Sequence, residues 1–412
     1  MNALNDLDRG YQKLLEDVII NGKVKDTRAG RVRSLFGKQF KIDLKKGFPL
    51  LTTKKVFVKG VIHELLWFLQ RSRNIHNSMN IEYLVRNGVH IWDDDAFRWF
   101  KEWVNKEIVG NVCEYFFVTA SSNDDELGLP VSFTYWIENE KRKGDVDWLL
   151  NLNKDEFIDL VLQRVEIRIP IDLGNSKIYR FGDLGEIYGK QWRSFGNSGL
   201  DQINKIIETL KTNPNDRRMV CLAWNPDVLN NVALPPCHVM MQFYTRELTT
   251  YERWEIYNER LVKNSGNSKF KKNYDDATNT FTNREKKNKL LLELEKENIP
   301  VYGLSCMYTC RSQDLFLGTP FNISSYALLT HIISKLVNME PDMLIASMGD
   351  CHIYEAHLDA VEEQLKRKGS ENLPKLIIEG KQEKIDDFKF NDFKIIGYNP
   401  DSPIKAPLLV GL

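Results

Sequence analysis

Hydrophobic residues recur at helical spacing in two segments near the start of the chain. Residues 8–22 place apolar side chains on one face, which predicts an amphipathic helix. These apolar positions are Tyr11, Leu14, Leu15, Val18 and Ile19. Residues 61–72, VIHELLWFLQRS, also have apolar residues at helical spacing and predict a buried helix. That helix carries Glu64 among apolar neighbours, where a solvated helix face is the simplest interpretation.

Further helix and strand patterns follow along the chain. Residues 34–44 predict a strand and a turn, and residues 200–226 predict a helix, a turn and a strand. Residues 320–339 predict a long helix, and residues 343–354 predict a strand that ends in polar groups. The mixture of long helices and strands predicts an α+β fold.

Two polar segments interrupt these patterns. Residues 105–180 contain turn-rich stretches such as TASSNDDELGLP, and residues 246–300 contain a stretch rich in Asn, Lys and Asp. The second segment then runs into KLLLELEKEN, a short helical pattern that Pro300 stops. We expect one domain over residues 1–412, with these two segments as insertions and no internal repeat.

Composition narrows the class of protein. Lys+Arg and Asp+Glu are both 57, so the net charge is zero, which argues against general DNA binding and against an anionic-membrane binder. No apolar run approaches the roughly 18 residues of a membrane span, and the N-terminus lacks a signal-peptide pattern. The cysteines have neither disulfide nor zinc spacing, so we expect free thiols, no metal and a cytoplasmic setting. They are Cys113, Cys221, Cys237, Cys306, Cys310 and Cys351.

The segment LPPCHVMMQFY places Cys237 directly after two prolines and before a strand pattern. A nucleophilic thiol needs a fixed approach angle, and nearby arginines would lower its pKa. A buried structural cysteine is the alternative that this segment alone leaves open. His238 has a structural role in our interpretation, because adjacent strand residues point to opposite faces.

Arginines beside a hydroxyl group suggest a phosphate clamp, since guanidinium presents a fixed fork of donors. Arg311 and Ser312 follow one strand pattern, Arg217 and Arg218 precede another, and Arg28 lies in a glycine-containing loop. Surface ion pairing is the alternative for each arginine.

Asn322 lies near the start of the long helix predicted over residues 320–339. Its amide can donate and accept at once, which suits the edge of an amide-like ring. Capping of the helix N-terminus is an equally good interpretation from the sequence alone.

Taken together and in order, the motifs resemble the thymidylate synthase family, in its folate-dependent, non-flavin form. The match covers nearly the whole chain except the two insertions. The motifs are FPLLTTKKVFVKGVIHELLWFLQ (48–70), GVHIWDDDAF (88–97), GDLGEIYGKQWRSFG (182–196), DRRMVCLAWNP (216–226), LPPCHVMMQFY (234–244), RSQDLFLGTPFNISSYALLTH (311–331), GDCHIY (349–354) and DFKIIGYNPDSPIKAPLLV (392–410).

The resemblance implies a thymidylate synthase-like fold and a one-carbon transfer to C5 of dUMP from 5,10-methylenetetrahydrofolate. Cys237 would add to C6 of the uracil ring, Glu64 would move protons near O4, and Asn322 would read the O4/N3 edge. Neither a metal nor a flavin is implied. The dUMP phosphate and ribose would be held by Arg28, Arg311, Ser312, His352 and Tyr354, with Arg217 and Arg218 reaching across a homodimer.

The resemblance also implies a folate site. Asp314 would hold the pterin, and Tyr188 and Asp183 belong to a motif that borders the active site. The folate slot would be lined by Trp92, Asp95, Leu317, Gly318, Phe321 and Val410.

The chain departs from the family pattern at four places. The family has Tyr-Gln where this chain has Thr309 and Cys310, and it has Asn or Trp where this chain has Asp95. Gly411 and Leu412 extend the usual C-terminus, and the loop around Arg28 is one residue shorter than usual.

These departures keep three functions open. Reductive methylation to dTMP and dihydrofolate is favoured. Deoxyuridylate hydroxymethylase, which is typical of viruses that modify their DNA, is the alternative, because Asp95 and the altered tail could admit water. The least favoured reading is an inactive nucleotide- or RNA-binding homologue that uses the basic segment NSKFKKNY near residues 267–274.

Overall fold

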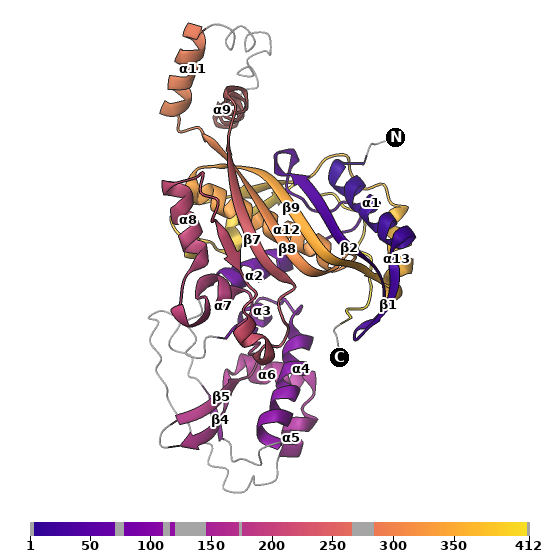
Figure 1. Ribbon diagram of the computed structural model, residues 1–412. Coiled ribbons are helices and arrows are strands. Elements are labelled where there is room, and N and C mark those ends of the chain that lie inside the picture. The colour runs from indigo at the N-terminus through magenta and orange to yellow at the C-terminus, as the bar shows by residue number, and fades with distance from the viewer. Residues whose placement is uncertain are drawn as a thin grey trace.

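The computed structural model describes residues 4–70, 78–109, 116–119, 146–172, 175–265 and 284–409. Its centre is a six-stranded sheet with the strand order β1-β2-β9-β8-β7-β6 (Figure 1). Neighbouring strands run antiparallel except β8 and β9, which are parallel. The predicted α+β fold with a mixed sheet is therefore confirmed. The strands are β1 (Lys23–Thr27), β2 (Gly30–Asp43), β6 (Val220–Leu222), β7 (His238–Glu247), β8 (Tyr302–Asp314) and β9 (Glu340–Tyr354).

The parallel strands β8 and β9 are joined by the long helix α12, because parallel neighbours need a crossover. Helix α12 packs against both strands, and α2 packs against α12. Helix α1 lies along β2, and α8 packs against β6. These four helices confirm the helices predicted from the sequence, and their bounds are α1 (Asp6–Asn21), α2 (Val58–Leu69), α8 (Gln202–Thr212) and α12 (Gly318–Val337).

Successive side chains of a strand point to opposite faces of the sheet, and here one face is covered and the other is open. One row of paired residues across five strands is buried: Cys221, Met241, Tyr308, Ala346 and Phe40. The adjacent row is only partly buried or exposed: Val220, Gln242, Met307, Ile345 and Lys41. The helices cover the first row, whereas the second row faces outward in this single chain (Figure 1).

Shorter elements complete the core. Helix α7 packs on α2 and α8, and a two-stranded hairpin lies near the C-terminus. The bounds are α3 (Glu82–Arg86), α4 (Asp93–Val104), α7 (Gly189–Arg193), α13 (Leu358–Leu365), β10 (Lys375–Ile378) and β11 (Phe393–Ile396).

The described part of the first predicted insertion packs against α4. Aromatic side chains of both parts form one cluster, in which Phe100 contacts Phe157, Tyr179 and Phe181. This cluster is continuous with the main hydrophobic core. The insertion contains an antiparallel three-stranded sheet and two helices: β3 (Phe116–Thr119), α5 (Val146–Asn151), α6 (Lys154–Leu162), β4 (Val165–Asp172) and β5 (Asn175–Arg180).

Within the described residues, the second predicted insertion contains two helices, α9 (Thr250–Ser265) and α11 (Arg284–Lys296), which project beyond the sheet (Figure 1). Trp254, Leu290, Leu294 and Ile299 give this pair a small apolar cluster of its own. The basic segment at residues 267–274 lies outside the described residues.

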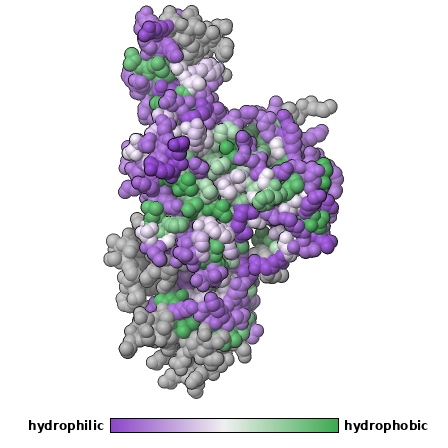
Figure 2. Space-filling view, in the orientation of Figure 1, coloured by the Kyte–Doolittle hydropathy of each residue, from purple (hydrophilic) through white to green (hydrophobic). Residues whose placement is uncertain are grey.

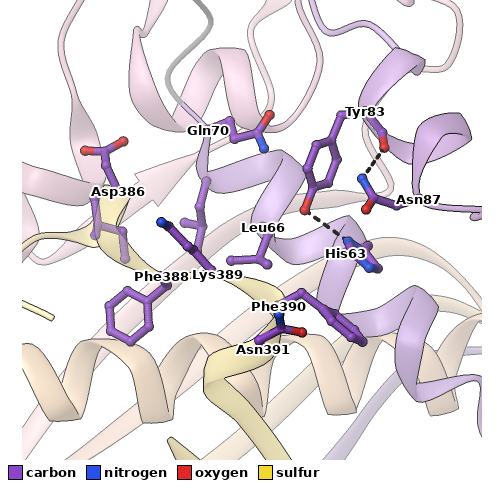
Figure 3. Close-up of a pocket in the computed structure, with 12 residues that line it drawn as sticks. His63, Leu66, Gln70, Tyr83, Asn87, Asp386, Phe388, Lys389, Phe390 and Asn391 are labelled. Carbon is purple, nitrogen blue, oxygen red and sulfur yellow. Dashed lines mark hydrogen bonds between the residues drawn. The ribbon is translucent and has the colours of Figure 1, made fainter. Parts of the chain in front are cut away.

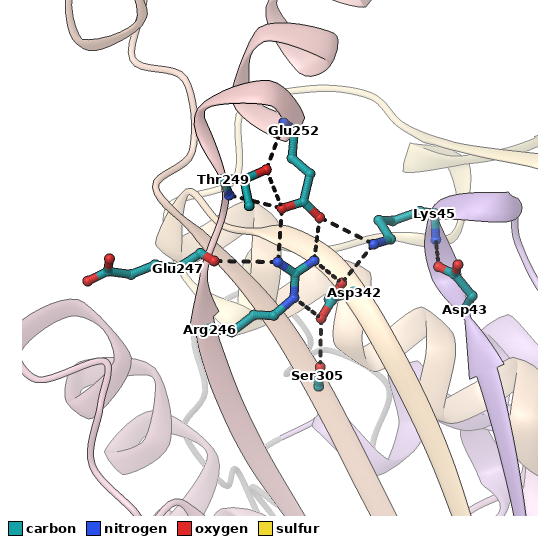
Figure 4. A network of polar contacts seen from close by, with 8 residues as sticks. All are labelled: Asp43, Lys45, Arg246, Glu247, Thr249, Glu252, Ser305 and Asp342. Carbon is teal, nitrogen blue, oxygen red and sulfur yellow. Dashed lines mark hydrogen bonds and ion pairs between the residues drawn. The ribbon is translucent and has the colours of Figure 1, made fainter. Parts of the chain in front are cut away.

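A polar network fixes the base of α9 to the sheet (Figure 4). The guanidinium of Arg246 donates to both oxygens of Asp342, at 2.8 Å each, and to both oxygens of Glu252. Hydrogen bonding to Arg246 holds the pKa of the Glu252 carboxyl well below its ordinary range. Lys45 lies 3.4 Å from the same two carboxylates and extends the network toward β2.

No helix in the described ranges is long and apolar enough to cross a membrane. The same residues contain no group of three His, Cys, Asp or Glu side chains that could hold a metal ion.

Candidate active site

The backbone around Cys237 is held by side chains and backbone groups from distant elements. We call residues 233–237 the thiol corner. Pro235 and Pro236 have no N–H to donate, so the corner is fixed through its carbonyl groups. Arg311 donates from Nη2 to the Pro235 oxygen at 2.7 Å and from Nε to the Pro236 oxygen at 2.9 Å. The Cys237 N–H donates to the Tyr188 hydroxyl at 2.9 Å, and the Arg311 N–H donates to the Cys237 carbonyl at 2.8 Å.

Arg98 holds the first residue of the thiol corner and was missed by the sequence analysis. Its Nη2 donates to the Ala233 carbonyl at 2.7 Å and to Asp95 Oδ1 at 3.0 Å, while Nη1 donates to Glu102 at 2.9 Å. The three-residue spacing of Asp95 and Arg98 in α4 was the available signal, because such residues are neighbours on a helix. Burial raises the pKa of the Asp95 carboxyl, although Arg98 opposes this rise.

The thiol of Cys237 is less acidic than the sequence suggested. Burial raises its pKa; the nearby Arg311 lowers it, and the Asp95 carboxylate raises it further. Arg311 Nη2 is 3.9 Å from the sulfur. Arg311 lowers this pKa, as expected of a nearby arginine, but in the single chain desolvation outweighs one guanidinium and the net shift is upward.

Glu64 does not lie on a solvated helix face. It is buried on α2, and its Oε1 accepts a hydrogen bond from Trp92 Nε1 at 2.8 Å. Burial raises the pKa of this carboxyl from 4.5 to about 7, with the Trp92 hydrogen bond opposing the rise. A carboxyl that gains and loses a proton near neutral pH is suited to general acid–base chemistry.

Tyr188 connects Glu64's neighbourhood to the thiol corner. Its ring lies 5.0 Å from Phe68 and 5.9 Å from Trp92, between centroids, while its hydroxyl accepts from Cys237. Its backbone φ of 29° is unusual for a residue with a side chain, and such strain persists only where the surroundings enforce it. The fold therefore constrains the residue that holds the Cys237 amide.

Asn322 does not cap α12, because that helix begins at Gly318 and has Leu317 at its N-cap. Its Nδ2 donates to Gln313 Oε1 at 3.3 Å. Gln313 is 1% exposed and was not predicted, although it lies between the predicted Ser312 and Asp314. Burial lowers the pKa of His238 to about 4, so its ring is neutral near pH 7.

Asp314 organises the turn that leads into α12. Its Oδ1 accepts from the N–H groups of Phe316 at 2.8 Å and Leu317 at 3.3 Å. Lys54, also missed from the sequence, is buried nearby, and its Nζ donates to the Phe316 carbonyl at 2.5 Å. Burial lowers the pKa of Lys54 to about 7. A Cβ added to Gly318 would lie 3.3 Å from Gln313 Nε2, so the glycine keeps this corner open.

The parallel ends of β8 and β9 bring further predicted residues together. Ser312 pairs with Asp350, and Asp314 pairs with His352. The rings of His352 and Tyr354 meet edge to face at 5.1 Å between centroids. Strand pairing of His238 with Cys310 places the thiol corner beside the same end of β8.

Comparison with known proteins identifies the family. The sequence matches the family described as thymidylate synthase over residues 9–260 and 288–410. The chain belongs to the thymidylate synthase family. Thymidylate synthase of Listeria monocytogenes serotype 4a is 34% identical over 408 residues, which cover 97% of this chain and 99% of the relative. That of Francisella tularensis subsp. holarctica is 33% identical over 416 residues, covering 98% and 100%.

Within this thymidylate synthase fold, some predicted residues stay apart from the thiol corner. The Arg218 side chain is 87% exposed and bonded to Asp216, and Arg217 is exposed beside it. Arg28 is exposed at the turn between β1 and β2. Asp183 is buried and accepts from Asn80 at 2.7 Å. Val410, Gly411 and Leu412 lie outside the described residues.

The structure describes the burial and contacts of Thr309 and Cys310, two residues that depart from the thymidylate synthase pattern. Thr309 belongs to the outward-facing row of the sheet, whereas Cys310 is fully buried. The Cys310 thiol donates to the Ser312 carbonyl at 3.0 Å, and burial raises its pKa. The thiol at this position therefore supports the strand end and is closed to solvent.

A cavity of about 350 Å³ lies between α2, α3 and the segment of residues 385–391 (Figure 3). None of the predicted site residues lines it. His63 stacks on Phe390 at 4.3 Å between ring centroids, and its Nδ1 lies 3.0 Å from the Tyr83 hydroxyl. A second cavity, of about 310 Å³, lies near the start of α9 and also contains none of the predicted site residues.

Proposed function

We propose that this chain catalyses the reductive methylation of dUMP to dTMP, with 5,10-methylenetetrahydrofolate as the co-substrate. The observation that carries the proposal is the thiol corner, in which Cys237 is fixed by Tyr188 and Arg311 within a chain that matches the thymidylate synthase family over residues 9–260 and 288–410. A fixed thiol beside a proton-exchanging carboxyl, Glu64, suits addition to a ring carbon followed by proton movements.

The first step is addition of Cys237 to C6 of the uracil ring. The raised pKa of the thiol means that a proton must leave as the bond forms. Arg311 is suited to binding the dUMP phosphate because only its Nε and Nη2 are used by the thiol corner within the described structure. Ser312, Arg28 and the Arg217–Arg218 pair of a second copy complete the proposed phosphate site.

The uracil ring is read from its O4/N3 edge by Asn322. The buried Gln313 orients this amide. Glu64 transfers protons near O4, which its pKa of about 7 allows at neutral pH. His352 and Tyr354 bind the ribose hydroxyl.

The residues assigned to folate fit a flat, polar ring system. Asp314 holds the pterin, and its Oδ2 has no hydrogen bond in the described residues. Trp92, Leu317, Gly318 and Phe321 form the wall, and Val410 belongs to the segment that closes it. When bound, the folate supplies the carbon unit and the hydride.

The open face of the sheet supports assembly as a homodimer. Figure 2 shows hydrophobic residues gathered over β7, β8 and β9 on this face. Tyr244 on β7 is two residues from Gln242, so it lies on this open face, and it is 63% exposed in the single chain. Large exposed apolar areas on soluble proteins are typical of interfaces. A second copy would also bring in Arg217 and Arg218, which are exposed and separate from their own Cys237.

Hydride transfer is favoured over hydration because Asp95 is engaged. Its Oδ1 accepts a hydrogen bond from Arg98 Nη2 at 3.0 Å, and the same Nη2 holds the Ala233 carbonyl of the thiol corner. The relatives are also named thymidylate synthase, not hydroxymethylase.

Product analysis tests the proposal directly. The purified protein is incubated with dUMP and 5,10-methylenetetrahydrofolate, and both products are identified by mass spectrometry. We expect dTMP and dihydrofolate, and Cys237→Ala should make neither while still binding dUMP. Formation of 5-hydroxymethyl-dUMP and tetrahydrofolate would refute the reductive step, and turnover by Cys237→Ala would refute the nucleophile.

A further inference from the structure

Gln313 is a buried amide in contact with Asn322, the residue assigned to the edge of the uracil ring. It lies on β8, pairs with Cys351 of β9 and is 1% exposed. Its Nε2 donates to the Asp314 carbonyl at 3.4 Å, and its Oε1 accepts from Asn322 Nδ2 at 3.3 Å. The amide of Gln313 therefore joins a backbone carbonyl to the side chain that faces the nucleotide.

The Asp314 carbonyl determines which way the Gln313 amide is turned. A carbonyl oxygen only accepts hydrogen bonds, whereas a side-chain amide donates from its nitrogen and accepts at its oxygen. This carbonyl also accepts from the buried Thr319 hydroxyl at 3.1 Å. If the Gln313 amide turned over, its oxygen would face the Asp314 oxygen with no hydrogen between them. Nε2 is therefore kept on the Asp314 side, and Oε1 on the Asn322 side.

The orientation of Gln313 in turn determines that of Asn322. Because Gln313 Oε1 is an acceptor, it favours the orientation in which Asn322 Nδ2 faces it. Turning Asn322 over would bring two amide oxygens together, and a buried polar atom without its partner is costly. Gly318 leaves room for both amides, since a Cβ built there would lie 3.3 Å from Gln313 Nε2 and 3.9 Å from Asn322 Nδ2. The two amides thus have a fixed polarity that begins at a backbone carbonyl.

This polarity matters because uracil and cytosine present opposite patterns along the same ring edge. Uracil has an N3–H donor and an O4 acceptor, whereas cytosine has an N3 acceptor and an N4 amino donor. In the fixed orientation, Asn322 Oδ1 can accept from N3–H while the second Nδ2 hydrogen donates to O4. Cytosine requires the Asn322 amide to be turned over.

We propose that Gln313 is a positioning residue that sets the preference for a uracil nucleotide over a cytosine nucleotide. It acts through Asn322 and does not itself touch the ring. The inference deepens the proposed function and rests on it, because it takes Asn322 as the residue at the ring edge.

Nucleotide binding tests this role without turnover. Dissociation constants for dUMP and dCMP are measured by calorimetric titration of the full-length protein, with no folate added. Gln313→Met keeps the length of the side chain but removes both polar atoms, so Asn322 can turn over at less cost. We expect the dissociation constant for dCMP to fall and that for dUMP to rise, which lowers the preference for dUMP about tenfold.

Two further variants separate orientation from packing. Gln364→Met makes the same change at another fully buried amide, which donates to Thr53, and it should keep the wild-type preference. Gln313→Glu retains an oxygen that accepts from Asn322, and its protonated form can also donate to the Asp314 carbonyl. It should keep the preference for dUMP, even if both nucleotides bind more weakly.

The outcomes distinguish this inference from the proposed function. An unchanged preference in a folded Gln313→Met, or an equal loss of affinity for both nucleotides, overturns the role of Gln313. A folded Gln313→Glu that loses the preference does so as well, and this result decides the question if the Met variant does not fold. A wild type that binds both nucleotides equally also overturns the inference. A wild type that prefers dUMP but forms no dTMP overturns the proposed function alone.

Discussion

Replacing Glu64 with Gln should remove catalysis and, at high pH, stabilise the protein. The side chain is buried on α2, and Trp92 Nε1 donates to its Oε1 at 2.8 Å. A Gln amide oxygen can accept the same hydrogen bond, so the substitution removes the ionisable proton with little change in shape. Loss of a positioned general acid–base typically lowers turnover about 10²- to 10⁴-fold.

The effect on stability follows from the pKa of Glu64. In the unfolded chain this carboxyl loses its proton near pH 4.5, whereas the folded protein retains the proton up to about pH 7. Between these values unfolding releases a proton, so the free energy of unfolding falls as pH rises. At about 1.36 kcal/mol for each pH unit, the destabilisation reaches roughly 3 kcal/mol above pH 7. Below pH 4.5 both states are protonated, and the destabilisation disappears.

Urea denaturation of wild type and Glu64→Gln, at equal protein concentration and at pH 4.5 and pH 8, measures this difference. We expect nearly equal stability at pH 4.5 and a variant more stable by roughly 3 kcal/mol at pH 8. Glu255→Gln, at an exposed position of α9, is the control and should show no such dependence. An equal difference at both pH values would refute the burial argument.

Three other substitutions test other parts of the structure. Arg98→Met should lower kcat about tenfold, which corresponds to about 1.4 kcal/mol, because the Ala233 carbonyl of the thiol corner loses its hydrogen-bond donor. Glu102→Gln leaves that hydrogen bond intact and should retain kcat. Asn322→Asp should shift kcat/KM toward dCMP, and unchanged discrimination would contradict its ring-edge role. Arg246→Met should destabilise the protein by about 2 kcal/mol in urea denaturation, because the Asp342 carboxylate, 4% exposed, loses its bidentate partner. A change below 0.5 kcal/mol would show that the network in Figure 4 is not stabilising.

The sequence predicted the elements with strong periodicity. The long helix over residues 320–339 and the buried helix over residues 61–72 are α12 and α2, because their apolar spacing is set by the core they share. The α+β class and the family also followed from motifs in order. The sequence did not predict which face of the sheet is covered and which is open. The pairing of β8 with β9 is decided by tertiary contacts.

Individual side-chain environments were predicted less well. Glu64 was read as solvated when judged from its helix alone, because one helix cannot show that Trp92 covers it. For Cys237 the lowering of the thiol pKa by a nearby arginine was expected, but the larger, opposing effect of burial could not be weighed from the local sequence. Arg98, Gln313 and Lys54 were missed, since their partners are distant in the chain or are backbone carbonyls.

The thiol corner also limits when the chain can become active during folding. The side chains that hydrogen-bond its backbone belong to Arg98 on α4, Tyr188 at the start of α7 and Arg311 on β8. Contacts of such long sequence separation form late, because each requires a long loop to close. A chain emerging from the ribosome therefore holds an unfixed Pro-Pro-Cys segment until residue 311 has been made and β8 has paired with β7. Cys237 acquires its final orientation only after most of the sheet is in place.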